Sequence, residues 1–244
     1  MTVKLHCFGE SGNAYKAALT LELAGMDWKS VYVDFFGGAT RSDEYRDLNV
    51  MAEAPVLVNG DFTLSQSGAI QQWVVDQTGQ LGGAAEDKYE VLRWLMFDNH
   101  KMSSQAGVTR FLMNFLPVNK RPQEAIKFMQ GRVMGALKTL ETHFAGRTWI
   151  VGDTMTIADI ANCGYLFYPE PYGFVRADWP NIDAWLGRVE ATPGMGPVSA
   201  RRAKPHAQRA WAQHKQVRTQ SIPTDPNGAH KRSATSQHMD IKMH

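Results

Sequence analysis

The chain has 244 residues, 43% of them hydrophobic, and carries 26 Lys and Arg against 24 Asp and Glu. It is long enough to bury one large core or two small ones, and no run approaches the roughly 18 consecutive apolar residues that a transmembrane helix requires. Its two cysteines, Cys7 and Cys163, stand in neither a Cys-x-x-Cys nor a metal-ligand spacing. This argues against a disulfide framework and a metal site, and predicts two buried thiols.

The basic residues are concentrated at one end of the sequence. Nine Lys and Arg but only two acids follow Ala200, so the preceding part carries 17 basic and 22 acidic residues. An acidic body argues against a folded nucleic-acid-binding face. The segment Met1 to Lys4 lacks the charged-then-apolar order of a secretory signal, and we therefore expect a soluble cytoplasmic protein without nucleic-acid or membrane partners.

The first part of the chain predicts a β-α-β-α order. Val3 to Phe8 alternates apolar and polar residues as a strand does, and Ala14 to Leu23 has helical character after a turn. Trp28 to Phe35 is rich in β-branched and aromatic residues, which favours a second strand. Gly37 to Asn49 is polar and only weakly helical.

A hairpin and a helix follow. Asn59-Gly60-Asp61 separates the apolar runs Pro55 to Val58 and Phe62 to Leu64, and Asn-Gly between such runs is a strong hairpin signal. Ser67 to Thr78 returns to helical spacing. The order predicts an α/β, thioredoxin-like N-terminal domain over residues 1–80, joined to the next unit by a linker, Gly79 to Glu86.

Beyond the linker no strand signal remains. Four segments carry apolar residues at helical spacing: Tyr89 to Phe115, Arg121 to Phe144, Thr156 to Tyr168, and Ile182 to Ala191. We expect an all-α C-terminal helical bundle domain over residues 87–200.

The remaining residues, 201–244, form a basic tail. A last helix is conceivable at Gln208 to Gln216, and the Ser, Thr, Pro and His that follow Val217 predict disorder. The tail either folds over a cleft of the body or extends into solvent, and its composition favours the extension.

Pro55 begins an apolar strand within Glu53-Ala54-Pro55-Val56-Leu57. Proline has no backbone donor and is tolerated in sheets at edges, strand starts or bulges. A cis bond here would turn the backbone N–H and C=O of Ala54 away from the ladder, where they could pair with an extended peptide ligand. The alternative is an ordinary trans proline at the start of an edge strand.

Two further motifs lie at predicted helix starts. Gln66 and Ser67 open the helix after the hairpin, where unpaired N–H groups and the helix dipole suit a carboxylate, and the Gln66 amide can accept from an ammonium group. Ser11 and Asn13 open the first helix and are placed to donate hydrogen bonds to an anion. The alternative for both serines is helix capping alone.

The order and spacing of these motifs resemble the cytosolic glutathione transferase superfamily, in its bacterial type with a Ser/Asn site, over roughly residues 1–200. The resemblance implies glutathione as co-substrate. It implies that Ala54 and Pro55 meet the cysteinyl backbone of glutathione, and we expect Glu53 beside them to bind glutathione as well. Gln66 and Ser67 would hold its γ-glutamyl end.

The same resemblance makes Ser11 and Asn13 the candidate activating residues, and leaves open which of them donates to sulfur. It further implies a homodimer with a detoxifying role.

The second domain strengthens the resemblance. Gly152 to Asp159 is similar to the family's Gly-Asp-x-x-Ser/Thr-x-Ala-Asp capping motif, in which Thr156 and Asp159 satisfy backbone donors at a buried helix start. Trp179 to Pro193 is similar to the family's closing segment. One departure is the loop before Pro55: Asn49-Val50-Met51-Ala52 lacks the proline and glycine that many members carry, so we expect this loop to differ.

The function implied is activation of the glutathione thiolate and its conjugation to a small electrophile. We expect the electrophile between the domains, near Met102, Arg110 and Phe111, although such residues also form bundle cores. Two alternatives remain: a glutathione-dependent disulfide reductase, and a non-catalytic glutathione- or ligand-binding module.

Overall fold

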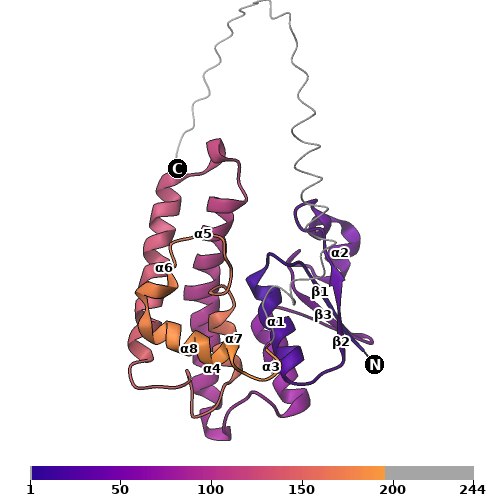
Figure 1. The fold of residues 1–244 in the computed structure, drawn as a ribbon. Coiled ribbons are helices and arrows are strands. Elements are labelled where there is room, and N and C mark those ends of the chain that lie inside the picture. Colours follow the sequence, from indigo (N-terminus) through magenta and orange to yellow (C-terminus); the bar gives the residue numbers. More distant parts are fainter. Residues whose placement is uncertain (1, 196–244) are drawn as a thin grey trace, which may run out of the picture. The chain divides into compact units, whose positions relative to one another are not determined.

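The computed structural model describes residues 2–195, and the expected tail with its helix lies outside these residues. A four-stranded mixed sheet has the order β2-β1-β3-β4 (Figure 1). Strands β1 and β2 run parallel, whereas β3 is antiparallel to both β1 and β4. The strands are β1 (Val3–Cys7), β2 (Trp28–Tyr32), β3 (Val56–Asn59) and β4 (Phe62–Ser65).

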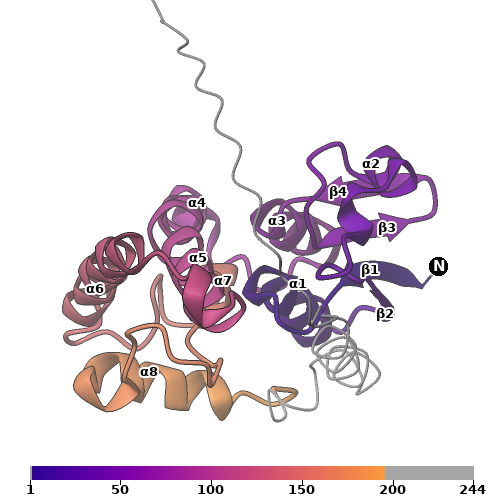
Figure 2. The ribbon, with the colours of Figure 1, turned by 90° about the horizontal axis from the view of Figure 1, so that it is seen from above.

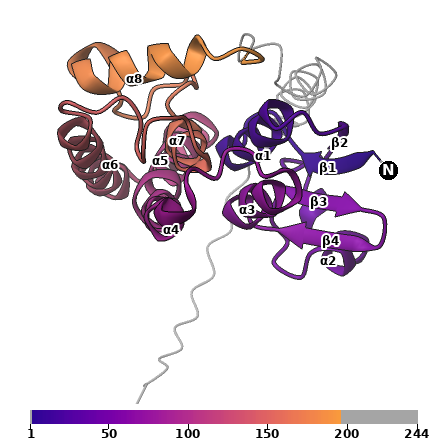
Figure 3. The ribbon, with the colours of Figure 1, turned by 90° about the horizontal axis from the view of Figure 1, so that it is seen from below.

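Helices cover both faces of this sheet. Helices α1 (Gly12–Leu23) and α3 (Ser67–Thr78) pack on one face, and α2 (Asp43–Leu48) packs on the other (Figures 2 and 3). The alternation of β1 explains the first face, because Val3, Leu5 and Cys7 all point to it. Leu5 lies opposite Leu57 of β3 on that face. The predicted thioredoxin-like α/β unit is confirmed.

The predicted hairpin is also confirmed. Asn59 pairs with Phe62, so Gly60 and Asp61 form a two-residue turn, and Gly60 adopts a φ of 63°. A glycine with positive φ at the first of two turn residues is typical of a type II′ hairpin turn, so the central residues are Gly60 and Asp61 rather than Asn59 and Gly60.

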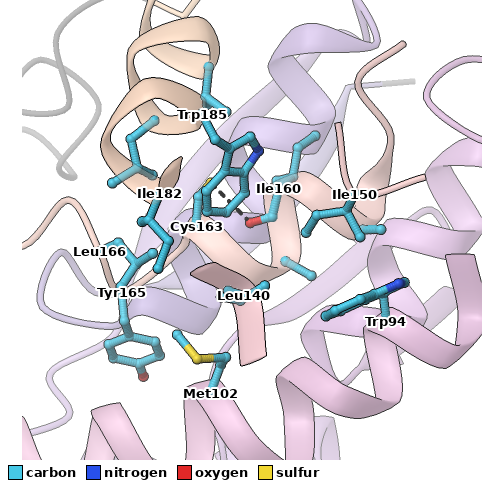
Figure 4. Packing of buried hydrophobic residues seen from close by; sticks show 14 of the residues in the cluster. Trp94, Met102, Leu140, Ile150, Ile160, Cys163, Tyr165, Leu166, Ile182 and Trp185 are labelled. Atoms are coloured by element: carbon cyan, nitrogen blue, oxygen red, sulfur yellow. Dashed lines mark hydrogen bonds between the residues drawn. The ribbon is translucent and has the colours of Figure 1, made fainter. Parts of the chain in front are cut away.

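The second half of the described chain is helical. Its main helices are α4 (Lys88–Phe97), α5 (Ser104–Asn114), α6 (Gln123–His143), α7 (Ile157–Cys163) and α8 (Pro180–Glu190). Their buried faces form one large core, in which Trp94, Leu140, Ile160 and Trp185 lie close together (Figure 4). Cys163 lies in the same core and donates its S–H to the carbonyl of Ile160 at 3.4 Å.

Two predicted helices differ in detail. The predicted helix Tyr89 to Phe115 contains one turn of π-helix, η3 (Asp98–Ser103), between α4 and α5. The predicted helix Thr156 to Tyr168 already ends at Cys163. The apolar spacing continues to Tyr168 because the side chains of Tyr165, Leu166 and Tyr168 still face the core. The backbone hydrogen bonds beyond Cys163, however, join residues three apart and form turns instead of an α-helix.

Glycines allow α1 and α7 to approach closely. A Cβ atom on Gly12 would lie 2.6 Å from the ring of Tyr165, and one on Gly164 would lie 2.6 Å from the side chain of Lys16. Both positions therefore require glycine for packing. The interface brings the start of α1 against the helical half of the chain.

Asp159 organises the start of α7. It accepts hydrogen bonds from the backbone N–H of Thr156 at 2.9 Å, from the backbone N–H of Ile150 at 3.0 Å and from the indole of Trp185 at 3.0 Å. The reciprocal contact between Thr156 and Asp159 is the predicted capping box. One carboxylate thus connects the helix start, the preceding loop and α8.

Within residues 2–195 no helix combines the length and the apolar character needed to cross a bilayer. The same part of the chain holds no group of three or more His, Cys, Asp and Glu placed to bind a metal ion.

Candidate functional site

Three segments that are distant in sequence meet at one end of the sheet. They are the start of α1, the loop before β3, and the turn from β4 into α3. The hydroxyl of Ser67 lies 3.5 Å from Oδ1 of Asn13, and the amide of Gln66 donates to the carboxylate of Glu53 at 2.9 Å. The structure therefore brings together the polar residues that the sequence motifs singled out separately.

Ser11 is the N-cap residue of α1. Its Oγ accepts a hydrogen bond from the backbone N–H of Ala14 at 3.1 Å, and the side chain is buried. Capping occupies an acceptor lone pair of the hydroxyl, whereas its proton can still be donated. Ser11 is thus fixed in orientation by the helix and remains a hydrogen-bond donor.

Asn13 belongs to a buried polar network. Its Oδ1 accepts from the ammonium group of Lys16 at 3.2 Å. Lys16 is fully buried and forms an ion pair with Asp98, and it also donates to the hydroxyl of Ser103. Ser103 in turn donates to Oδ1 of Asp98 at 2.8 Å. The network links the first turn of α1 to both ends of the π turn η3.

Sequence reasoning missed Lys16 and Asp98. They are 82 positions apart, and a lysine at a helical position or an acid in a polar stretch gives no signal of pairing. The only available hint was the position of Lys16 on the otherwise apolar face of the predicted first helix.

The bond between Ala54 and Pro55 is cis, as the sequence suggested. The loop before it is held by side chains, since the carbonyl of Glu53 accepts from the hydroxyl of Tyr45 at 3.0 Å and from the amide of Asn49 at 2.8 Å. These contacts fix the backbone immediately before Ala54.

Ala52, in the same loop, has a φ of 54°, in the left-handed region that favours glycine. The sequence leads us to expect a difference in this loop, and Ala52 adopts a conformation that glycine takes more easily.

We predict that Ala52→Gly raises the free energy of unfolding by about 0.5–1 kcal/mol, because relief of left-handed strain exceeds the added entropy of the unfolded chain. Urea unfolding measures the change. Ala184→Gly is the matched control, because Ala184 is exposed within α8, where glycine should cost about 1 kcal/mol. A loss of stability in both variants would contradict the strain at Ala52.

Gln66 and Ser67 occupy the start of α3. Gln66 is the N-cap residue with a φ of 70°, and its side chain makes no capping bond. Ser67 is the first residue of the helix, so the alternative of a plain serine cap does not describe it. Strained backbone of this kind is frequent at ligand-binding sites. The Ser67 hydroxyl lies 3.5 Å from Oδ1 of Asn13, so the start of α3 adjoins the start of α1.

The three expected electrophile-site residues lie in different environments. Met102 is only 2% exposed and belongs to the helical core. Arg110 is also 2% exposed; it forms an ion pair with Glu170 at 2.9 Å and stacks on the ring of Tyr168 at 4.0 Å. Phe111, in contrast, is 38% exposed. Of the three, only Phe111 presents a substantial accessible surface.

An aromatic cluster that the sequence did not reveal includes Phe111. Phe8 stacks on Phe35 at 4.5 Å between ring centroids, Phe36 stacks on Phe115 at 5.2 Å, and Phe115 stacks on Phe111 at 6.2 Å. We call these five residues the phenylalanine cluster. The backbone carbonyl of Phe8 accepts a hydrogen bond from the backbone N–H of Ser11, so the cluster begins directly beside the start of α1.

Neither cysteine is suited to nucleophilic chemistry. Burial raises the pKa of the Cys7 thiol to about 11, and burial also raises the pKa of the Cys163 thiol. A thiolate is the reactive form, so both thiols stay protonated and inert near neutral pH. A sulfur nucleophile at this site would have to come from a ligand.

Comparison with known proteins gives a consistent result. Residues 1–76 match the family model described as the N-terminal domain of glutathione S-transferase, and residues 100–193 match the model of its C-terminal domain. A solved glutathione S-transferase from Xanthobacter autotrophicus Py2 is 31% identical, with a TM-score of 0.74, and the match covers 82% of this chain and 99% of that protein.

Two other similarities bear on function. A glutathione transferase from Burkholderia graminis, solved with two glutathione molecules bound per subunit, is 26% identical with a TM-score of 0.73, over 84% of this chain and 89% of that one. Besides plant glutathione S-transferases, the curated relatives include elongation factor 1-gamma 3 of Oryza sativa subsp. japonica. It is 24% identical over 86% of this chain, which spans only 55% of that relative.

Proposed function

This chain belongs to the glutathione S-transferase family, and from that membership we propose that it binds glutathione, activates the thiol as a thiolate and transfers it to a small electrophile. The observation that carries the proposal is the contact between Asn13 and Ser67 at 3.5 Å. It joins the starts of α1 and α3, so that a group suited to the thiol and one suited to a carboxylate belong to a single site.

The tripeptide backbone meets the loop before β3. Ala54 directly precedes Pro55 and β3, and its backbone N–H and C=O would pair with the cysteinyl backbone of glutathione. The γ-glutamyl carboxylate binds Ser67 and the first N–H groups of α3, helped by the helix dipole.

The α-ammonium group of the γ-glutamyl residue binds the carboxylate of Glu53 and the side-chain amide oxygen of Gln66. This role fits the observed orientation of Gln66, whose amide nitrogen is directed to Glu53. The amide oxygen therefore remains available as an acceptor.

Ser11 and Asn13 stabilise the thiolate. A free thiol with a pKa of about 8.5 is only a few per cent ionised at neutral pH, and lowering its pKa by two requires roughly 2.7 kcal/mol. A charge-assisted hydrogen bond contributes about 1.5–3 kcal/mol and a helix N-terminus about 0.3–1 kcal/mol. The donors present at the start of α1 therefore suffice in magnitude.

The electrophile lies against the phenylalanine cluster, which is the aromatic surface next to Ser11. In the transfer step the thiolate sulfur forms a bond to an electrophilic carbon of the substrate. With a halogenated aromatic substrate the carbon–halogen bond then breaks, and the halide leaves with the electron pair. The phenylalanine rings would stack on the planar substrate and exclude water.

Glutathione titration tests the proposal. We expect the wild-type protein to lower the pKa of the bound thiol by about 2, measured by thiolate absorbance in the ultraviolet across pH. Ser11→Ala and Asn13→Ala should each raise that pKa by about 1–2, because each removes one charge-assisted donor. The variant with the larger change identifies the main donor.

Ser42→Ala is the matched control for Ser11→Ala. Ser42 caps α2 in the same way, accepting from the backbone N–H of Tyr45 at 3.2 Å. Both serine variants should therefore lose about 1 kcal/mol of stability, but only Ser11→Ala should change the thiol pKa. Equal thiol pKa values in the wild type, Ser11→Ala and Asn13→Ala would reject thiolate activation by these residues.

Two alternative functions predict different results in these experiments. A non-catalytic glutathione-binding module is favoured by the similarity to elongation factor 1-gamma 3. It predicts glutathione binding with no pKa change and no turnover of any electrophile. A glutathione-dependent disulfide reductase predicts the same thiolate but turnover of a small mixed disulfide in place of an aromatic electrophile.

We also propose that the chain divides into domains at 1–80 and 87–200, and limited proteolysis between Gly79 and Glu86 tests this division. We further propose that the protein is a homodimer, and light scattering tests its oligomeric state.

A further inference from the structure

We propose that the buried Lys16 is a positioning residue for Asn13: its ammonium group holds Oδ1 of the amide and thereby directs Nδ2, the donor end, toward the glutathione sulfur. The inference rests on the proposed function, because it assigns a direction to one of the two candidate thiolate donors. It adds Lys16 and its partners to a site that otherwise consists of residues near the ligand.

The argument begins with the hydrogen-bonding capacity of the ammonium group. An ammonium group has three protons to donate and accepts nothing. Lys16 has three acceptors within reach, namely Oδ1 of Asn13, a carboxylate oxygen of Asp98 and the hydroxyl oxygen of Ser103. All three donors are therefore used, and exchanging any of the three acceptors for a donor would leave a buried N–H of the ammonium group unsatisfied.

This requirement fixes the Asn13 amide. The oxygen and nitrogen of a primary amide have nearly the same shape, so its orientation is decided by its neighbours. Lys16 accepts no hydrogen bond, and therefore the oxygen must face it. The Ser67 hydroxyl, 3.5 Å from the same oxygen, is compatible with this orientation, because a hydroxyl can donate as well as accept. Nδ2 makes no hydrogen bond to any of residues 2–195 in the structure, and it is left for the ligand.

The partners of Lys16 come from the helical half of the chain. Asp98 and Ser103 are the first and last residues of η3, and Ser103 donates to Asp98 while accepting from Lys16. Lys16 is fully buried, so water cannot replace either partner. The helical half thus determines the orientation of a donor that is carried by the thioredoxin-like half.

The test uses a variant designed to fold. Lys16→Met combined with Asp98→Leu removes both charges together, which avoids an uncompensated buried charge. We expect the pKa of bound glutathione thiol to rise by about 1, which is a tenfold smaller ratio of thiolate to thiol, because Asn13 is no longer held. Binding of S-methylglutathione, which has no ionisable thiol, should change less than about twofold in dissociation constant, because its carboxylate and backbone contacts remain.

Asn13→Asp is a second, nearly isosteric variant. It keeps an oxygen toward Lys16 but removes the donor, so the fold should be retained while the thiol pKa returns toward that of free glutathione. If the amide were reversed, with its oxygen toward the sulfur, Asn13 would supply no donor to the sulfur, and Asn13→Ala would leave the thiol pKa unchanged.

The outcomes are distinguishable. A wild-type protein that lowers the thiol pKa, together with a folded double variant that lowers it equally, overturns the role of Lys16 alone. A wild-type protein that binds glutathione without changing its thiol pKa overturns both this inference and the proposed function. A rise in the thiol pKa in both the double variant and Asn13→Asp, with unchanged S-methylglutathione binding, supports the inference.

Discussion

Asp98→Ala is expected to lower the free energy of unfolding by about 3–5 kcal/mol, because it leaves the ammonium group of Lys16 buried without a countercharge. Lys16 is 0% exposed and the Asp98 side chain only 6% exposed, so solvent screens neither charge. Ser103 also loses its acceptor on Asp98. Equilibrium unfolding in urea at pH 7 measures the effect.

The charge-neutral variant Lys16→Met with Asp98→Leu is the control, and should lose no more than about 1–2 kcal/mol, because paired charges are often replaceable by apolar groups. The single variant Lys16→Met has a pH signature. Burial raises the pKa of Asp98, so the native carboxyl binds a proton more readily than the unfolded one, and the variant should regain stability as the pH falls. Equal stability of Asp98→Ala and the wild type would show that the ion pair is unimportant.

Asp159→Ala is expected to cost a similar amount, about 3–5 kcal/mol. It leaves three buried donors without an acceptor, namely the backbone N–H groups of Ile150 and Thr156 and the indole of Trp185. Each unsatisfied buried group costs about 1–3 kcal/mol. Asp153→Ala is the matched control in the same loop; Asp153 is exposed, and its loss should change stability by less than about 0.5 kcal/mol.

Asp159 also predicts a pH dependence. Burial raises its pKa from the ordinary value to about 6, despite the donors that favour the ionised form. The native carboxyl therefore holds its proton at a higher pH than the unfolded one, and stability falls as the pH rises from about 4 to about 6. The contribution of this single group is roughly 3 kcal/mol. Asp159→Asn cannot titrate, so its unfolding free energy should lack this decline.

Features that depend on neighbouring residues could be predicted from the sequence. The hairpin turn at Gly60, the capping box of Thr156 and Asp159 and the proline at the start of β3 are local in origin, because each depends on the conformational preferences of a few adjacent residues. The two halves of the fold followed from the change between strand and helix periodicity. Ser11, Asn13 and Ser67 were found because helix starts have a recognisable composition.

Features that depend on tertiary contact could not be predicted. The phenylalanine cluster joins Phe8, Phe36 and Phe115, which lie far apart in sequence, and no periodicity marks an aromatic residue for such a partner. The environment of Arg110 also depends on a distant residue that the sequence does not indicate. Arg110 was expected near the electrophile, whereas it is buried and forms an ion pair with Glu170.

The π turn η3 has a consequence for the angular phase of the helix that contains it. In an α-helix each residue advances about 100°, so residues five apart lie about 140° from each other around the axis. In a π-helix the hydrogen bonds join residues five apart, which aligns Asp98 with Ser103. One additional residue in the turn is therefore what allows two side chains of a single helix to contact the same buried ammonium group.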